Sequence, residues 1–189
     1  MEFALCAAGF ALFALYDRHS VRPLAPVCGG AFAAGLACLA AATALAVWNA
    51  PAVRGAGGWA LLAAALVFLA LEIYTLFFAL PFSDTYVQQS QGRLAYTEGV
   101  YALCRHPGVL WFAGGYLCLA GAMGSGRLWG FCLLMSGLDV AYVVLQDLWT
   151  FPRTFDNYPE YRSLAPFLIP NPASLRRCIQ TLRKEVRRG

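Results

Sequence analysis

The segment TEGVYALCRHPG, residues 97–108, holds the most concentrated set of reactive side chains in the sequence. Arg105 and His106 stand together directly before an apolar run, where charged side chains need a polar partner. An arginine guanidinium suits a carboxylate or a phosphate, because its fork of N–H donors matches two oxygens at once. A histidine beside it supplies a further hydrogen bond or a base. The pair therefore predicts a site for an anionic group.

Three acidic residues fall inside apolar runs, namely Glu72, Asp139 and Asp147. A carboxylate at the centre of a bilayer costs about 3 kcal/mol, so such residues usually face a cavity or a polar partner. Glu72 and Asp139 fit a helix–helix hydrogen bond as well as they fit a functional role. Asp147 falls near the end of its run, at the membrane surface where Arg105 and His106 are expected. A cationic and an anionic group should converge there.

Aromatic side chains accompany these charges along the sequence. Aromatic rings can enclose a flat base, and they attract a positive sulfonium through the ring face. A ligand with an amino acid end, an aromatic base and a sulfonium matches the cation, the carboxylate and the rings together, and that ligand is S-adenosylmethionine. Each tyrosine fits equally well as an anchor at the membrane interface. The aromatic residues are Tyr101, Trp149, Phe155, Tyr158 and Tyr161.

The composition indicates what kind of scaffold positions these groups. Of 189 residues, 60% are hydrophobic and 13% are charged, whereas a soluble domain carries about a quarter charged residues. The sequence predicts one all-α, polytopic membrane domain over 1–189. Its seven cysteines form no CxxC pair, so neither a metal site nor a disulfide framework is expected. The five predicted spans are Phe3–Tyr16, Pro26–Trp48, Gly57–Leu80, Gly108–Ala122 and Arg127–Thr150.

Basic residues predict the orientation of the chain in the membrane. A cytoplasmic C-terminus leaves only Arg54 and Arg127 outside and puts the other twelve basic residues inside, as the positive-inside rule favours. Segments 81–107 and 151–189 then share the cytoplasmic side and pack over the bundle. We expect an interfacial helix over Pro81–Tyr101 and a basic surface helix over Ala173–Arg188, capped by Asn171 or Ser174. The basic tail indicates anionic lipid as a partner and not nucleic acid.

Two sequence blocks in residues 94–172 resemble the integral-membrane methyltransferases that include isoprenylcysteine carboxyl methyltransferase and the phospholipid N-methyltransferases. The first block, T-x-G-x-Y followed by RHP, stands here as Thr97, Gly99, Tyr101, Arg105, His106 and Pro107. The second follows the last span and holds an acid, F-x-x-x-Y-x-x-Y and two spaced prolines. It stands here as Asp147, Phe155, Tyr158, Tyr161, Pro166 and Pro170.

The resemblance implies an S-adenosylmethionine site built from both blocks, within a cofactor-binding region 81–172 that lies between generic helices 1–80 and a basic tail 173–189. His106 and the backbone of 101–105 would hold the cofactor, Asp147 would meet its amino group, and Tyr158 and Tyr161 would close the pocket. Three positions depart from the family pattern: Leu148 replaces a second acid, Asp156 replaces a glycine, and Gly108–Trp111 replaces a small-residue-then-tyrosine step.

Methyl transfer to a lipophilic acceptor is the function that these features predict. The acceptor class stays open between an isoprenylcysteine carboxylate, a phospholipid amine and a similar small lipophilic molecule. A carboxylate acceptor needs no base, whereas an amine or a thiol must lose a proton, for which His106 or Glu72 would serve. Two other functions are compatible with the sequence: an NADPH-dependent membrane reductase of the steroid or sterol reductase type, and a membrane scaffold or transporter without catalysis. The oligomeric state is not predicted.

Overall fold

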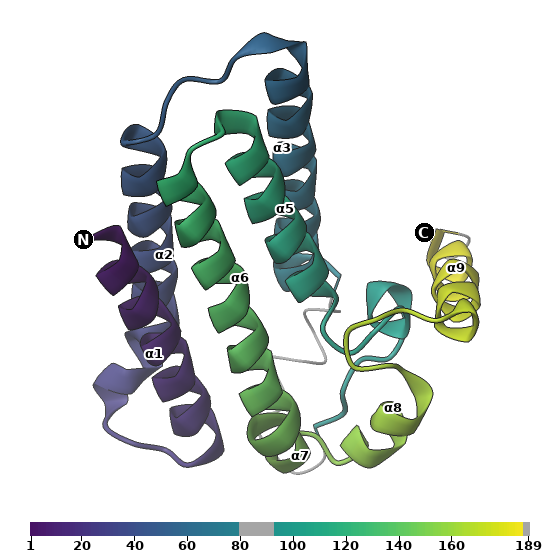
Figure 1. Cartoon of the computed structure of the whole chain (residues 1–189). Helices are drawn as coiled ribbons and strands as arrows, with labels where there is room; N and C mark the ends of the chain where they lie inside the picture. Colours follow the sequence, from purple (N-terminus) through teal and green to yellow (C-terminus); the bar gives the residue numbers. More distant parts are fainter. Residues whose placement is uncertain (80–92, 187–189) are drawn as a thin grey trace.

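The computed structural model describes residues 1–79 and 93–186, and every regular element in these ranges is helical. Figure 1 shows the long helices running side by side, with the shorter C-terminal helices gathered at one end of the bundle. The long helices are α1 Glu2–Val21, α2 Ala31–Trp48, α3 Gly55–Phe77, α5 Pro107–Met123 and α6 Gly126–Leu145. The shorter elements are η1 Pro26–Gly30, η2 Gly99–Ala102, η3 Gln146–Thr150, α7 Phe151–Thr154, α8 Tyr158–Leu164 and α9 Pro172–Val186.

The helices α1 and α2, α3 and α5, and α5 and α6 pack as antiparallel neighbours, and α1 runs parallel to α6. Helix α1 packs on α2 and α6, and α5 packs between α3 and α6. Glycines permit the closest approaches: a Cβ at Gly35 would lie 2.9 Å from the Gly9 carbonyl oxygen, and a Cβ at Gly114 would lie 2.9 Å from the Phe68 ring. Gly35 and Gly114 therefore let their helices approach closely.

The turn between α5 and α6 is set by two adjacent residues. Gly124 ends α5 in the left-handed conformation with φ of 63°, which costs glycine little. Ser125 then caps α6, because its hydroxyl accepts a hydrogen bond from the Leu128 amide. This two-residue connection makes α6 run back alongside α5, so Asp147 returns to the end of the bundle at which α5 begins.

Within residues 1–79 and 93–186, three helical segments are long and apolar enough to cross a membrane: Pro26–Trp48, Gly55–Phe77 and Gly126–Thr154. The 17-residue helix Pro107–Met123 is apolar but shorter than these. Helix α1 is longer than the first predicted span, because it continues through Asp17, Arg18 and His19 to Val21. Asp17 is buried there and accepts a hydrogen bond from Thr150. This contact with a residue distant in sequence gives the buried carboxylate a polar partner within the helix bundle.

The interfacial helix expected over Pro81–Tyr101 lies largely outside the described residues, since 80–92 are not described. Residues 93–98 form no helix, and η2 is a single turn, so the C-terminal part of that prediction is wrong. The predicted basic surface helix is confirmed as α9. Asn171 and Ser174 both act at its start: the Ser174 amide donates to Asn171 Oδ1, and the Asn171 amide donates to Ser174 Oγ.

Candidate functional site

A π-helical turn at the end of α6 positions Asp147. The Phe151 amide bonds to the carbonyl of Gln146, five residues back, in place of the usual four. Pro152 explains the wider turn, because it has no N–H to donate to the carbonyl of Leu148. The extra residue in the turn places the buried Asp147 carboxylate at the end of the bundle where α5 begins, facing the segment before α5.

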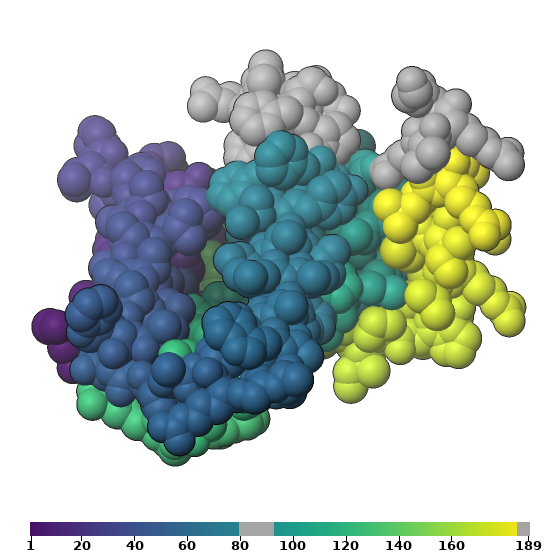
Figure 2. Space-filling model, turned by 90° about the horizontal axis from the view of Figure 1, so that it is seen from above, coloured from purple at the N-terminus to yellow at the C-terminus, as the bar shows by residue number. Residues whose placement is uncertain are grey.

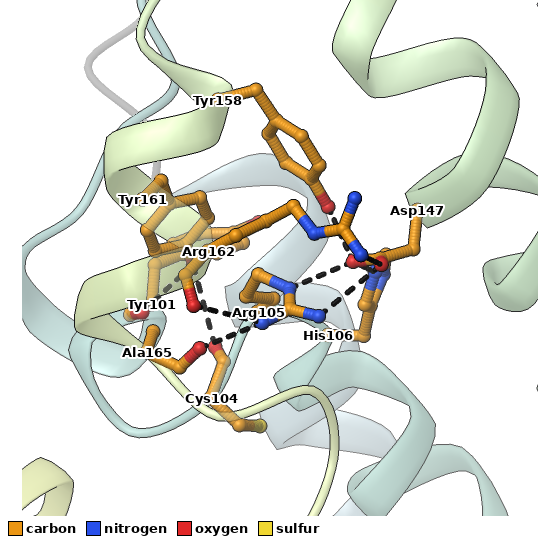
Figure 3. Close-up of polar contacts among 9 residues, drawn as sticks. All are labelled: Tyr101, Cys104, Arg105, His106, Asp147, Tyr158, Tyr161, Arg162 and Ala165. Carbon is orange, nitrogen blue, oxygen red and sulfur yellow. Dashed lines mark hydrogen bonds and ion pairs between the residues drawn. The ribbon is translucent and has the colours of Figure 1, made fainter.

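The Asp147 carboxylate is the centre of a polar cluster that joins the two sequence blocks (Figure 3). Arg105 donates to it through Nε and Nη2, at 2.7 and 3.2 Å. The Tyr158 hydroxyl donates at 2.5 Å, and His106 Nε2 lies 3.4 Å from the same Oδ1 atom. A second cation, Arg162, reaches Oδ2 at 3.8 Å. The side chains of Asp147 and Arg105 are only 5% and 9% exposed, so the ion pair is buried.

Arg105 also connects the start of α5 to the segment after α8. Its Nη1 donates to the carbonyls of Ala165 at 2.8 Å and Arg162 at 3.4 Å, and its backbone amide donates to Pro166 at 2.9 Å. The guanidinium carbon stands 5.6 Å from the centre of the Phe167 ring. Burial lowers the pKa of Arg105, but its hydrogen bonds and charge interaction with Asp147 outweigh that effect and the net shift is upward.

His106 is held between two aromatic rings. Its imidazole stacks on Phe151 with ring centres 5.5 Å apart, and its edge meets Phe167 at 5.3 Å. Burial lowers the pKa of His106 more than the hydrogen bond to Asp147 raises it. The imidazole is therefore neutral near pH 7 and carries its proton on Nε2, since a carboxylate can only accept.

The aromatic tail packs against the first block through a small core of its own. Tyr158 and Tyr161 are buried with Ala95 and Ala165. The Tyr161 hydroxyl donates to the carbonyl of Tyr101 at 2.8 Å. Further along, the Asn157 side chain bonds both backbone groups of Ala95, at 2.6 and 3.1 Å. These contacts hold residues 93–105 against α8.

Gly99 and Pro107 have backbone roles. Gly99 is buried with φ of 56°, a conformation that other residues rarely adopt. Its amide donates to Thr181 Oγ1 in α9 at 3.0 Å. Pro107 is the first residue of α5, where its missing N–H leaves no hydrogen bond unmade. Both residues shape the chain around the cluster and place no polar side chain in it.

Glu72 lies beside the cluster, on α3. A Cβ at Gly108 would stand 3.1 Å from Glu72 Oε2, so the carboxylate contacts the first turn of α5. A helix N-terminus favours a negative charge. Oε2 is buried and has no hydrogen-bond partner among the described residues. One turn further along α3, Thr75 accepts from Tyr101 Oη at its carbonyl and from Trp111 Nε1 at its hydroxyl.

The structure therefore brings together Arg105, His106, Asp147 and Tyr158 directly, with Tyr161 and Tyr101 in the adjoining layer. Sequence reasoning missed Arg162, Phe151 and Phe167. The signal for Arg162 was its position inside the aromatic tail, but nothing in the sequence indicated which way its side chain turns. The two phenylalanines resemble ordinary interfacial residues until His106 is seen between them.

The cluster combines one anion with two cations, a neutral imidazole and buried rings. It lies next to Glu72, whose Oε2 atom has no hydrogen-bond partner in the part of the chain that the structure describes. Such an arrangement can bind a zwitterion through exchange of ion pairs, orient a cation over aromatic rings and supply a base. Comparison with known proteins adds nothing to this chemistry, because no family model, curated protein or solved structure matches the chain.

Proposed function

We propose that this protein is a membrane methyltransferase that transfers a methyl group from S-adenosylmethionine to a lipophilic acceptor. The observation that carries the proposal is the convergence of the two sequence blocks on Asp147. Residues 105 and 106 precede α5, and Tyr158 and Arg162 follow α6, yet all four reach one buried carboxylate. The resemblance of these blocks to the membrane methyltransferases supplies the identity of the cofactor.

The Arg105–Asp147 pair offers a charge-balanced place for the amino acid end of the cofactor. In the proposal, the ligand carboxylate takes the guanidinium and His106, while the ligand ammonium takes Asp147. One internal ion pair is exchanged for two, so no buried charge is left without a partner. Tyr158 and Tyr161 close the pocket, and the rings of Phe151 and Phe167 lie close enough to His106 to face a sulfonium.

The reaction is an in-line displacement at the methyl carbon. A nucleophilic atom of the acceptor forms the new bond to carbon while the carbon–sulfur bond breaks, and the electron pair leaves with sulfur as S-adenosylhomocysteine. An amine or thiol acceptor also loses a proton. Glu72 is placed for that role, because its unpartnered oxygen lies on the membrane-spanning helix α3 beside the first turn of α5. The protein aligns the two reactants and excludes water.

The orientation of the molecule belongs to the same proposal. Arg127 donates to Glu2 at 2.8 Å, so the start of α6 and the start of α1 share one end of the bundle. The polar cluster and Thr150, which bonds Asp17, lie at the other end. We place the cluster and the C-terminus at the cytoplasmic face, because that end holds most of the basic residues. The cofactor enters from water, and the acceptor enters sideways from the membrane.

Cofactor binding to the full-length protein in lipid nanodiscs tests the proposal. S-adenosylhomocysteine at about 100 times its dissociation constant should stabilise the protein by about 2.7 kcal/mol, whereas NADPH should not. His106→Asn should abolish that shift, and Arg153→Gln, an exposed cation outside the cluster, should preserve it. A shift with NADPH alone would identify a reductase instead.

Catalysis needs a second experiment. Transfer of labelled methyl groups from S-adenosylmethionine into a total lipid extract, followed by identification of the product, gives the acceptor. Glu72→Gln should abolish transfer to an amine or thiol acceptor while cofactor binding stays unchanged. Absence of both binding and transfer would exclude a methyltransferase, and cofactor-independent flux across liposomes would favour a transporter.

A further inference from the structure

Helix α9 has two faces that carry different side chains. Ser174, Cys178 and Thr181 recur at helical spacing, and the first two are buried. This inner face packs on η2, where Thr181 receives the hydrogen bond from the Gly99 amide. Leu175, Ile179 and Leu182 form a second stripe, also at spacings of four and three. Leu175 is 50% exposed and Ile179 is 42% exposed, so the described part of the chain leaves this apolar stripe largely uncovered.

Arg176 and Arg183 border the uncovered stripe on the side away from η2, whereas Arg177 and Lys184 lie on the opposite side of the helix from the stripe. An apolar stripe next to a basic one is the pattern of a helix that lies in the headgroup region of a membrane. The apolar side chains of the stripe match the acyl chains at the membrane boundary, and the cations match the lipid phosphates.

The position of α9 fits this surface. Figure 1 shows α9 foreshortened, and the end-on view in Figure 2 shows it extended, so its axis runs across the long helices. It lies at the height of the lower part of α5 in Figure 1, near the helix end at which η2 leads into Pro107. A helix with this direction would lie along the surface of a membrane that the long helices cross.

We propose that α9 docks on the anionic headgroups of the membrane that the bundle crosses, and that docking steadies η2 and the 97–108 segment. The link is the Thr181–Gly99 hydrogen bond, at 3.0 Å. Anionic lipid thus holds the first block of the polar cluster in place from outside the cluster. This inference rests on the faces and direction of α9 and holds whether or not the protein transfers methyl groups.

Photo-crosslinking from two adjacent positions of α9, 179 and 180, tests which face of the helix contacts lipid. A benzoylphenylalanine replaces either Ile179 or Gln180 in the full chain, reconstituted in nanodiscs of phosphatidylcholine with or without phosphatidylglycerol. Both positions are exposed, but they point about 100° apart around the helix. Position 179 should form lipid adducts and position 180 should not. Equal labelling at the two positions, or protein adducts from position 179, would overturn the proposal, the latter by showing that a protein covers this face.

The dependence of lipid adduct formation on charge provides a second test of the docking. Each basic residue near the surface should favour anionic lipid about fivefold. The double variant R176Q/R183Q should therefore reduce the enhancement of adduct formation by phosphatidylglycerol about 25-fold, and high salt should weaken it in the parent protein. An enhancement as large in the double variant as in the parent protein would show that charge does not hold the helix in place.

Hydrogen exchange at Gly99 tests the coupling. Exchange of that amide should be slower in nanodiscs with phosphatidylglycerol than without it. Thr181→Val keeps the side-chain shape and removes the hydroxyl that accepts the bond, so it should abolish the difference while Ile179 adducts persist. Exchange that is the same in both lipids for the parent protein would overturn the coupling.

Discussion

Replacement of Asp147 by asparagine is the sharpest test of how the two blocks are held together. The change keeps the shape of the side chain and removes its charge, which leaves the buried Arg105 guanidinium without a counter-ion. Removal of one partner from a buried ion pair costs about 3–5 kcal/mol. Arg105 keeps its bonds to the carbonyls of Ala165 and Arg162, so we expect the lower end, about 3 kcal/mol.

The reactivity of the Cys104 thiol measures the local effect of Asp147→Asn. Its thiol is fully buried next to Arg105, and burial raises its pKa to about 11, so it reacts only when the segment opens. A cost of about 3 kcal/mol raises the open population about 150-fold. The assay is the rate of Cys104 alkylation in nanodiscs, followed by peptide mass spectrometry. Asp156→Asn, the same change at an exposed residue between α7 and α8, is the control and should leave the rate unchanged.

A double variant separates the ion pair from the rest of the packing. When Arg105→Met is combined with Asp147→Leu, no buried charge is left, so the pair should cost less than Asp147→Asn alone. Either of two results would contradict a buried ion pair. One is a Cys104 alkylation rate in Asp147→Asn within about threefold of the parent rate. The other is a cost of the double variant equal to the sum of the costs of Arg105→Met and Asp147→Leu measured singly.

Three further predictions concern neighbouring residues. Tyr158→Phe keeps the ring and removes one hydrogen bond to a carboxylate, so thermal unfolding should show a loss of about 1.5 kcal/mol; no loss would show that this bond is not formed. Gly114→Ala should cost about 1–3 kcal/mol because its Cβ meets Phe68, whereas Gly137→Ala, with open space around it, should be neutral or stabilising. Because the pKa of His106 is lowered in the folded protein, stability should fall as pH drops below about 6.5, and His106→Asn should flatten that dependence.

Several features of this protein were predictable from sequence because they depend on local pattern. Apolar runs predicted the long helices, and Asn171 with Ser174 predicted the start of α9. Charged side chains are costly in the hydrocarbon region of a membrane, and this predicted that Arg105, His106 and Asp147 share one end of the bundle. Polarity also predicted that the first span stops before Asp17; helix α1 continues past this residue, and a distant residue, Thr150, donates a hydrogen bond to its buried carboxylate.

Only the tertiary structure decided which groups meet. Helical periodicity predicts the face on which a residue lies, but it does not predict which distant donor forms a hydrogen bond to a given carboxylate. The π turn before Pro152, the carbonyls that hold Arg105 and the rings on either side of His106 all depend on segments more than 40 residues apart or on a local break in periodicity. The sequence therefore determined the helices and the types of polar group, whereas long-range packing determined that these groups form one buried cluster.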